Sequence, residues 1–449
     1  MSRSETLGTA ESHSLGYPWP VSLGLWSTWY TSGSHSDGPQ RVVWTVDRIW
    51  KSERMADPLN SLQNILDARL TVSLESDVPL IAMVERRIRV LAEKGRTTAY
   101  KRPLIVGTLE GKRSWTIRPI DLLRRIGEET TPPFLPSQNM ARLSASWATL
   151  RYFWAIDPWL GQGGPLRLSA EARDLDFHQK TLLSDEFGIG IGALCMEEYF
   201  GAAKCLDLSY VLAQSGSFQG LTLTQSTSPD YLMWGPQPTY YVVECKGSQS
   251  SERQAIDQIR RGLEQVVSVR FASGPYNSET LVACTFLDNA GTRVFLVDPP
   301  DEDGPSEGES HRVRRILIED AEAFATRVAA DNHARLLSWA GLYRRAGVVG
   351  HALGQPVPSV DVVERPTEVR KTTNGPYVGT VSPLFPQLGR DGLALFTGVR
   401  PHLTEPAKDY RDATWGFDVR GSEPSTVEHD IPSNISWGRN GTCMIVEGL

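Results

Sequence analysis

Three residues near the middle of the chain have the types and spacing that phosphodiester chemistry requires. Asp230 lies fourteen residues before Glu244, and Lys246 follows Glu244 by two residues. Phosphodiester hydrolysis needs a hard cation to neutralise the transferring phosphoryl group, and carboxylates are the protein ligands that Mg²⁺ prefers. A nearby ammonium group can position the attacking water or stabilise developing negative charge. The three residues are therefore candidate catalytic residues, and Asp230 and Glu244 are candidate metal ligands.

The local sequence predicts how these residues are brought together. The apolar, β-branched and aromatic segment 239–246 predicts a strand that ends in Glu244 and Lys246. Side chains alternate between the faces of a strand, so these two share one face. Gly235-Pro236 predicts a turn, and a hairpin around it would return Asp230 to the side of Glu244.

A helix is expected on each side of this strand in the sequence. Segment 184–200 predicts a helix capped by Ser184, and segment 251–270 predicts another. Glu197 and Glu198, near the end of the first helix, are expected to face solvent. Three glycines are expected to let this helix approach the sheet closely, namely Gly188, Gly190 and Gly192.

Pro229-Asp230 followed by Glu244-Cys245-Lys246 resembles the motif of the PD-(D/E)xK nuclease superfamily. The resemblance covers residues 165–300, about a third of the chain. It implies an α/β fold of the restriction-endonuclease-like type, a mixed sheet flanked by helices. It also implies Mg²⁺ or Mn²⁺ held by Asp230, Glu244 and the backbone carbonyl of Cys245, with Lys246 acting on the attacking water.

The same resemblance implies further site residues and a function. A helix before the motif often contributes an acidic residue, for which Glu186 is the best match. A helix after it often contributes a glutamine, here Gln258 or Gln254. The implied protein is a metal-dependent nuclease, with DNA expected over RNA, acting in restriction or anti-phage defence. The alternative is a nuclease fold that does not cleave and serves as a binding or scaffold subunit of a nucleic-acid-processing complex.

Composition shifts divide the chain into three expected parts. Residues 1–160, which include a Trp-rich stretch, are expected to form an α+β module. Residues 161–346 contain the nuclease-like domain, an acidic linker at 298–310 and a helical region at 318–346. Residues 347–449, rich in Pro, Gly and short β-like segments, are expected to form a β-rich module.

Several other elements are expected outside the motif. Segment 78–94 has apolar residues at helical spacing, and 103–117 resembles a hairpin with a turn at Glu110-Gly111. Further strands are expected at 205–212, 219–225, 230–234, 280–287 and 292–297.

Bulk properties limit partners and location. The formal net charge of -7 argues against a surface that coats nucleic acid throughout, so phosphate contacts are expected from local basic segments at Arg86–Arg102, Arg260-Arg261 and Arg312–Arg315. No P-loop motif occurs, so an ATPase or recognition subunit would be a separate protein, and oligomerisation is left open. A polar N-terminus, the lack of a membrane-spanning apolar run and five scattered cysteines favour a cytoplasmic protein without disulfides.

Overall fold

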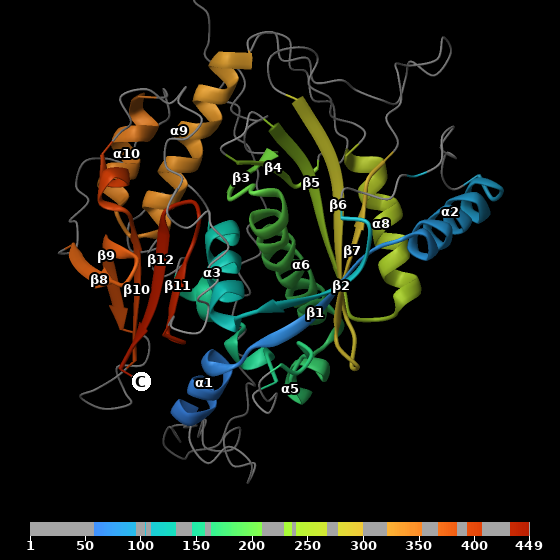
Figure 1. The fold of residues 1–449 in the computed structure, drawn as a ribbon, viewed down its shortest axis with the longest axis horizontal. Helices are drawn as coiled ribbons and strands as arrows, with labels where there is room; N and C mark the ends of the chain where they lie inside the picture. The colour runs from blue at the N-terminus through green and yellow to red at the C-terminus, as the bar shows by residue number, and fades with distance from the viewer. Residues whose placement is uncertain are drawn as a thin grey trace, which may run out of the picture. The chain divides into compact units, whose positions relative to one another are not determined.

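A seven-stranded mixed sheet contains the candidate catalytic strand. In this computed structural model the sheet has the order β2-β1-β7-β6-β5-β4-β3 (Figure 1). Its strands are β1 (Leu70–Ser76), β2 (Gly111–Ile117), β3 (Lys204–Asp207), β4 (Tyr231–Trp234), β5 (Thr239–Ser248), β6 (Asn277–Leu287) and β7 (Thr292–Val297). The described residues are 58–95, 104, 109–131, 146–157, 163–208, 229–235, 239–266, 277–299, 321–352, 367–383, 393–405 and 432–448.

The register of β4 and β5 confirms the predicted hairpin. β4 is antiparallel to β5 and pairs Tyr231 with Val243, which places Asp230 next to Glu244. On its other side β5 runs parallel to β6. The predicted strand 239–246 is confirmed and continues to Ser248.

One face of the sheet is covered by helix α6 (Phe177–Phe200), and the other by α8 (Glu252–Val266) and α2 (Val78–Ala92) (Figure 1). α8 is the crossover between the parallel strands β5 and β6, and its apolar residues recur at helical spacing and are buried. The predicted helix at 78–94 is confirmed by α2. The mixed α/β class expected from the sequence is therefore observed.

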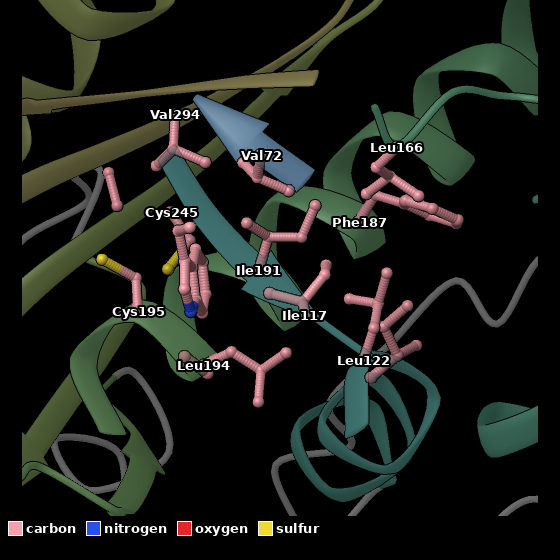
Figure 2. Packing of buried hydrophobic residues seen from close by; sticks show 14 of the residues in the cluster. Val72, Ile117, Leu122, Leu166, Phe187, Ile191, Leu194, Cys195, Cys245 and Val294 are labelled. Carbon is pink, nitrogen blue, oxygen red and sulfur yellow. The ribbon is translucent and has the colours of Figure 1, made fainter. Parts of the chain in front are cut away.

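α6 approaches β5 closely because it carries glycines at the contact. A Cβ atom on Gly188 would lie 2.7 Å from the Lys246 backbone, and one on Gly192 would lie 2.9 Å from the Cys245 sulfur. Figure 2 shows Cys245 among the side chains of α6 and the neighbouring strands. The predicted reason for these two glycines is confirmed. Gly190 faces a different neighbour, the Ile126 side chain of α3 (Pro119–Thr130).

Two predictions about α6 are wrong. The helix begins at Phe177 and not at 184, because the Asp176 carboxylate caps the His178 and Gln179 backbone N–H groups. The Ser184 hydroxyl donates to the Lys180 carbonyl within the helix. Glu197 does not face solvent, because it is buried and accepts hydrogen bonds from other elements, which are described below.

The N-terminal strands are part of the same sheet. The sheet spans the boundary predicted at residue 160, because β1 and β2 precede that residue and β3 to β7 follow it. β2, the second arm of the hairpin predicted at 103–117, is a strand that pairs antiparallel with β1, and most of the first arm lies outside the described residues. The Trp-rich stretch before residue 58, the strand predicted at 219–225 and Arg312–Arg315 lie outside the described residues, as does most of the predicted linker at 298–310.

The C-terminal part contains two helices and a second sheet. α9 (Ala321–Trp339) and α10 (Tyr343–Ala352) are separated at Gly341, which has a φ of 78°. An antiparallel sheet follows in the order β11-β12-β10-β9-β8. Its strands are β8 (Glu368–Thr372), β9 (Gly375–Pro383), β10 (Ala394–Val399), β11 (Ile435–Trp437) and β12 (Thr442–Glu447). The β-rich character predicted after residue 347 is observed.

A buried ion network joins α3 to the C-terminal sheet. Arg124 and Arg125 both bind Glu128, at 2.7 and 2.8 Å, and Arg125 also contacts Glu129 at 3.1 Å. The Thr442 hydroxyl donates a hydrogen bond to Glu128. Burial opposes the ionisation of Glu128, but the two guanidinium groups lower its pKa to about 2. The charges are therefore paired inside the protein, as buried charges must be.

Glu197 extends this network to α6. Its carboxylate accepts a hydrogen bond from Arg124 at 3.2 Å and one from the Arg439 backbone N–H at 2.7 Å. Glu198, by contrast, is exposed as expected. No helix in the described part of the chain is long and apolar enough to cross a membrane.

Candidate active site

Asp230 and Glu244 fix each other in place through two hydrogen bonds. The Asp230 backbone N–H donates to Glu244 Oε2 at 2.9 Å, and the Cys245 backbone N–H donates to Asp230 Oδ2 at 3.0 Å. These bonds form because β4 begins at Tyr231, one residue after Asp230, and Tyr231 pairs with Val243, the residue before Glu244. Each carboxylate keeps one oxygen that this pair of bonds does not use.

Lys246 lies between the two carboxylates. Its Nζ is in direct contact with Glu244 Oε1 and is 3.8 Å from Asp230 Oδ2. Burial alone would lower the pKa of Lys246, but the Asp230 and Glu244 carboxylates raise it above its ordinary value. The ammonium form is therefore favoured in the protein without a metal.

The two carboxyl groups resist ionisation in this environment. Burial raises the pKa of Asp230 to about 6, with Lys246 opposing the rise. Burial and the nearby Asp230 charge raise the pKa of Glu244 to about 8, and its side chain is 0% exposed. Carboxyl groups with raised pKa values, held together by a strand register, are typical of functional sites.

Glu186 lies next to a different cluster. Its carboxylate contacts the Arg151 guanidinium directly and hydrogen-bonds to the Tyr152 hydroxyl. Burial raises the pKa of Glu186, and Arg151 opposes the rise. Glu186, the acid predicted from this helix, is therefore engaged in an ion pair with Arg151.

Asp185 is the acidic residue of α6 that faces the candidate site. Its charge acts on both Lys246 and Asp230, and desolvation raises its pKa although Lys246 lowers it. Sequence reasoning missed this residue. Gly188 touches the Lys246 backbone, and Asp185 lies three residues earlier on the same helix face, whereas Glu186 lies two residues earlier on another face. The spacing from the glycine was the signal that could have identified it.

Gln258 lies on the side of α8 that faces the site. Gly262 packs against Glu244, since a Cβ atom on it would lie 3.1 Å from Glu244 Cγ. Gln258 is four residues before Gly262 and so shares its helix face. It lies one helical turn nearer to the end of β5 that carries Lys246. Gln258 is partly buried, whereas Gln254 is exposed.

The donor set fits a hard cation. Within the described residues, no group of three or more His, Cys, Asp and Glu side chains is placed to hold a metal ion. Mg²⁺ is commonly held by one or two carboxylates and retains several waters, so Asp230 and Glu244 satisfy its requirement. The Cys245 carbonyl lies on the same side of β5 as its N–H, which donates to Asp230, because both backbone groups of a strand residue face the same neighbour.

The basic segments expected to bind phosphate are partly used inside the protein. Arg87 Nη2 binds Asp257 Oδ2 at 2.7 Å, which joins α2 to α8. Arg260 binds Glu264 at 2.7 Å along α8. Arg86, which precedes Arg87, and Arg261, which follows Arg260, are exposed.

Comparison with known proteins adds no assignment. No family model, no curated protein and no solved structure matches this chain. The site is therefore interpreted from its own geometry.

Proposed function

We propose that the protein is a metal-dependent nuclease that hydrolyses phosphodiester bonds, with DNA as its expected substrate. The observation that carries the proposal is the convergence of Asp230, Glu244 and Lys246, two carboxyl groups with raised pKa values around one ammonium group. An ion pair formed only for stability would not require two mutually repelling carboxyl groups beside one ammonium group. The resemblance of the motif to the PD-(D/E)xK superfamily supports the same assignment.

Each residue has a role in this proposal. Asp230 and Glu244 would hold Mg²⁺ or Mn²⁺ with the Cys245 carbonyl, and the ion would supply charge neutralisation at the phosphate and a more acidic water. Because Lys246 is held in its ammonium form, its role is to orient the attacking water and to stabilise developing negative charge. Asp185 faces the same space from α6 and is a candidate for orienting a metal-bound water.

The proposal is tested with the full chain and four substrates: linear DNA, circular DNA, single-stranded DNA and RNA. Cleavage is expected in Mg²⁺ or Mn²⁺ and not in EDTA. Lys246→Ala is expected to reduce the cleavage rate by about 100-fold or more. Lys112→Ala is the matched control, because Lys112 is an exposed lysine on β2, at the far edge of the sheet.

Two outcomes would contradict the assignment. Cleavage that survives in Lys246→Ala would show that the activity comes from another site. Nucleic-acid binding by the unmutated protein without cleavage of any of the four substrates would favour the non-cleaving scaffold.

A further inference from the structure

Helices α2 and α8 carry four exposed arginines on the sides that they turn away from the sheet. These are Arg86 and Arg89 on α2, and Arg253 and Arg261 on α8. None of the four side chains forms a hydrogen bond or an ion pair with another described residue. The apolar residues of both helices are buried toward the sheet, so the four guanidinium groups point to solvent. We call these four side chains the outer arginine surface.

The acidic side chains within the same two helices are bonded inside the protein. Each is held by a basic side chain or a backbone N–H: Asp257 by Arg87, Glu252 by Arg293 and Glu264 by Arg260, each at 2.7 Å, and Glu85 by the Leu104 N–H at 3.0 Å. Asp257 lies four residues from both Arg253 and Arg261, and its bond to Arg87 offsets the charge that would oppose them. Glu93, an exposed acid at the end of α2, is followed by the exposed Lys94. The surface is therefore basic although the whole chain has a formal net charge of -7.

The outer arginine surface offers positive charge without a stacking platform. Neither α2 nor α8 contains a Phe, Tyr, Trp or His residue. Guanidinium groups bind phosphate oxygens through paired hydrogen bonds. Proteins that recognise single strands add aromatic rings on which the unpaired bases stack. The chemistry of this surface therefore fits a phosphate backbone whose bases are already paired.

Helix α8 joins the outer arginine surface to the candidate active site. Gly262 packs against Glu244, and Arg261, one residue earlier, is exposed on the same turn. The two groups are therefore separated by about the diameter of a helix, roughly 10–12 Å. The major groove of a B-form duplex is about 12 Å wide, so a duplex with one backbone at Lys246 can place its other backbone on this surface. A single strand has no second backbone to place there.

We propose that the outer arginine surface binds the phosphate backbone of a nucleic-acid duplex, so that the substrate of the candidate active site is double-stranded. The inference rests on the proposed nuclease function and specifies its substrate class. Arg253 and Arg261 are eight residues apart on α8, about 12 Å along its axis, and contact phosphates of one backbone. Arg86 and Arg89 extend the surface onto α2.

The test measures binding by the full-length Lys246→Ala protein, which is expected not to cleave. The probes are a short fluorescent duplex and its labelled single strand, and affinities are measured by anisotropy between about 50 and 200 mM salt. We expect tighter binding of the duplex. Arg253→Gln combined with Arg261→Gln should weaken duplex binding and reduce the slope of log K against log salt by about 2, because each phosphate contact contributes about 0.9. Lysine at both positions should keep the slope, because the charge remains.

Arg344→Gln is the matched control, because Arg344 is an exposed arginine on α10. It should bind the duplex with the affinity and salt slope of its parent. Unchanged affinity and slope in the double variant at Arg253 and Arg261 would overturn the inference, as would equal or tighter binding of the single strand. Displacement of the probe by polyglutamate as effectively as by unlabelled duplex, at equal charge concentration, would also overturn it and indicate docking of an acidic protein.

The same variants separate this inference from the proposed function. Cleavage of duplex by the unmutated protein, at a rate that Arg253→Gln with Arg261→Gln leaves unchanged below saturation, would overturn the surface and keep the nuclease. Duplex binding that depends on these arginines, without cleavage by the unmutated protein, would support the surface and overturn the nuclease.

Discussion

Asp230 donates its backbone N–H to the Glu244 carboxylate at 2.9 Å, so one metal-ligand candidate holds the other in position through its main chain. The reciprocal bond from the Cys245 N–H to Asp230 Oδ2 fixes the second carboxylate in the same way. Both bonds depend on the antiparallel register of β4 and β5. The arrangement is set by the backbone, and the free energy of strand pairing offsets part of the cost of placing two acids together.

The acidic residues of α6 should have separate roles. Asp185→Asn removes a charge that faces Lys246 and is expected to slow cleavage about 10- to 100-fold without loss of folding. Glu186→Gln disrupts the contact with Arg151. It is expected mainly to lower the unfolding temperature and to slow cleavage less than Asp185→Asn does. Steady-state cleavage kinetics and thermal unfolding of both variants provide the comparison. A larger rate loss in Glu186→Gln would return the role to that residue.

The metal-free protein should lose stability as the pH rises from about 4 to about 8. Asp230 and Glu244 have pKa values raised from 3.8 to about 6 and from 4.5 to about 8. The folded state therefore binds more protons than the unfolded state in this interval, and the free energy of unfolding falls as they dissociate. The raised pKa of Lys246 adds a contribution to the free energy of unfolding that stays constant over this pH range. That contribution is lost only above the ordinary lysine pKa of 10.5.

Urea unfolding in EDTA at about pH 5 and about pH 8 measures this loss. Glu244→Gln is expected to reduce the difference, and Mg²⁺ is expected to restore stability mainly at the higher pH, where the carboxylates are ionised. An unchanged pH difference in Glu244→Gln would contradict the assignment of the effect to this group.

Gly188→Ala should destabilise the protein although alanine favours helices. An added Cβ atom would lie 2.7 Å from the backbone carbon and oxygen of Lys246, which cannot rotate away. The overpacking cost of about 1–3 kcal/mol should exceed the gain of about 1 kcal/mol in helix propensity. Chemical unfolding measures the net change, and cleavage assays should show a loss of activity from displacement of Lys246. A more stable variant would show that α6 can move away from β5.

Arg125 should be far more important for stability than Arg345, a partly exposed arginine. Arg125→Ala leaves Glu128 and Glu129 with fewer partners inside the protein and is expected to cost about 3–5 kcal/mol. Arg345→Ala breaks a surface pair with the exposed Glu405 and a hydrogen bond to the Thr404 carbonyl, and is expected to cost about 1 kcal/mol. Both values come from urea unfolding of the full chain. Similar losses for the two variants would show that the buried network is not a net source of stability.

The local sequence was sufficient to place the strand and hairpin of the site. Alternation along 239–246 predicted which residues share a face, and Gly235-Pro236 predicted the return of Asp230 to Glu244. Both are confirmed because they depend on neighbours close in the chain. The glycines at 188 and 192 were likewise predictable, since only a missing side chain permits that approach.

Long-range partners could not be read from the sequence. Residue type made Glu186 as good a candidate as Asp185, and only the rotation of α6 against β5 separates them. Glu197 was expected in solvent, yet Arg124 and the Arg439 backbone, from distant segments, compensate its burial.

The sequence by itself determined the strand at 239–246, its alternation and the candidate trio, because period-two alternation and turn residues act over a few positions. The tertiary structure decided which strands join it, as β1 and β2 do across residue 160, and which charges are paired or left facing Lys246. Pairing and burial depend on contacts between segments tens to hundreds of residues apart. No local pattern encodes those contacts.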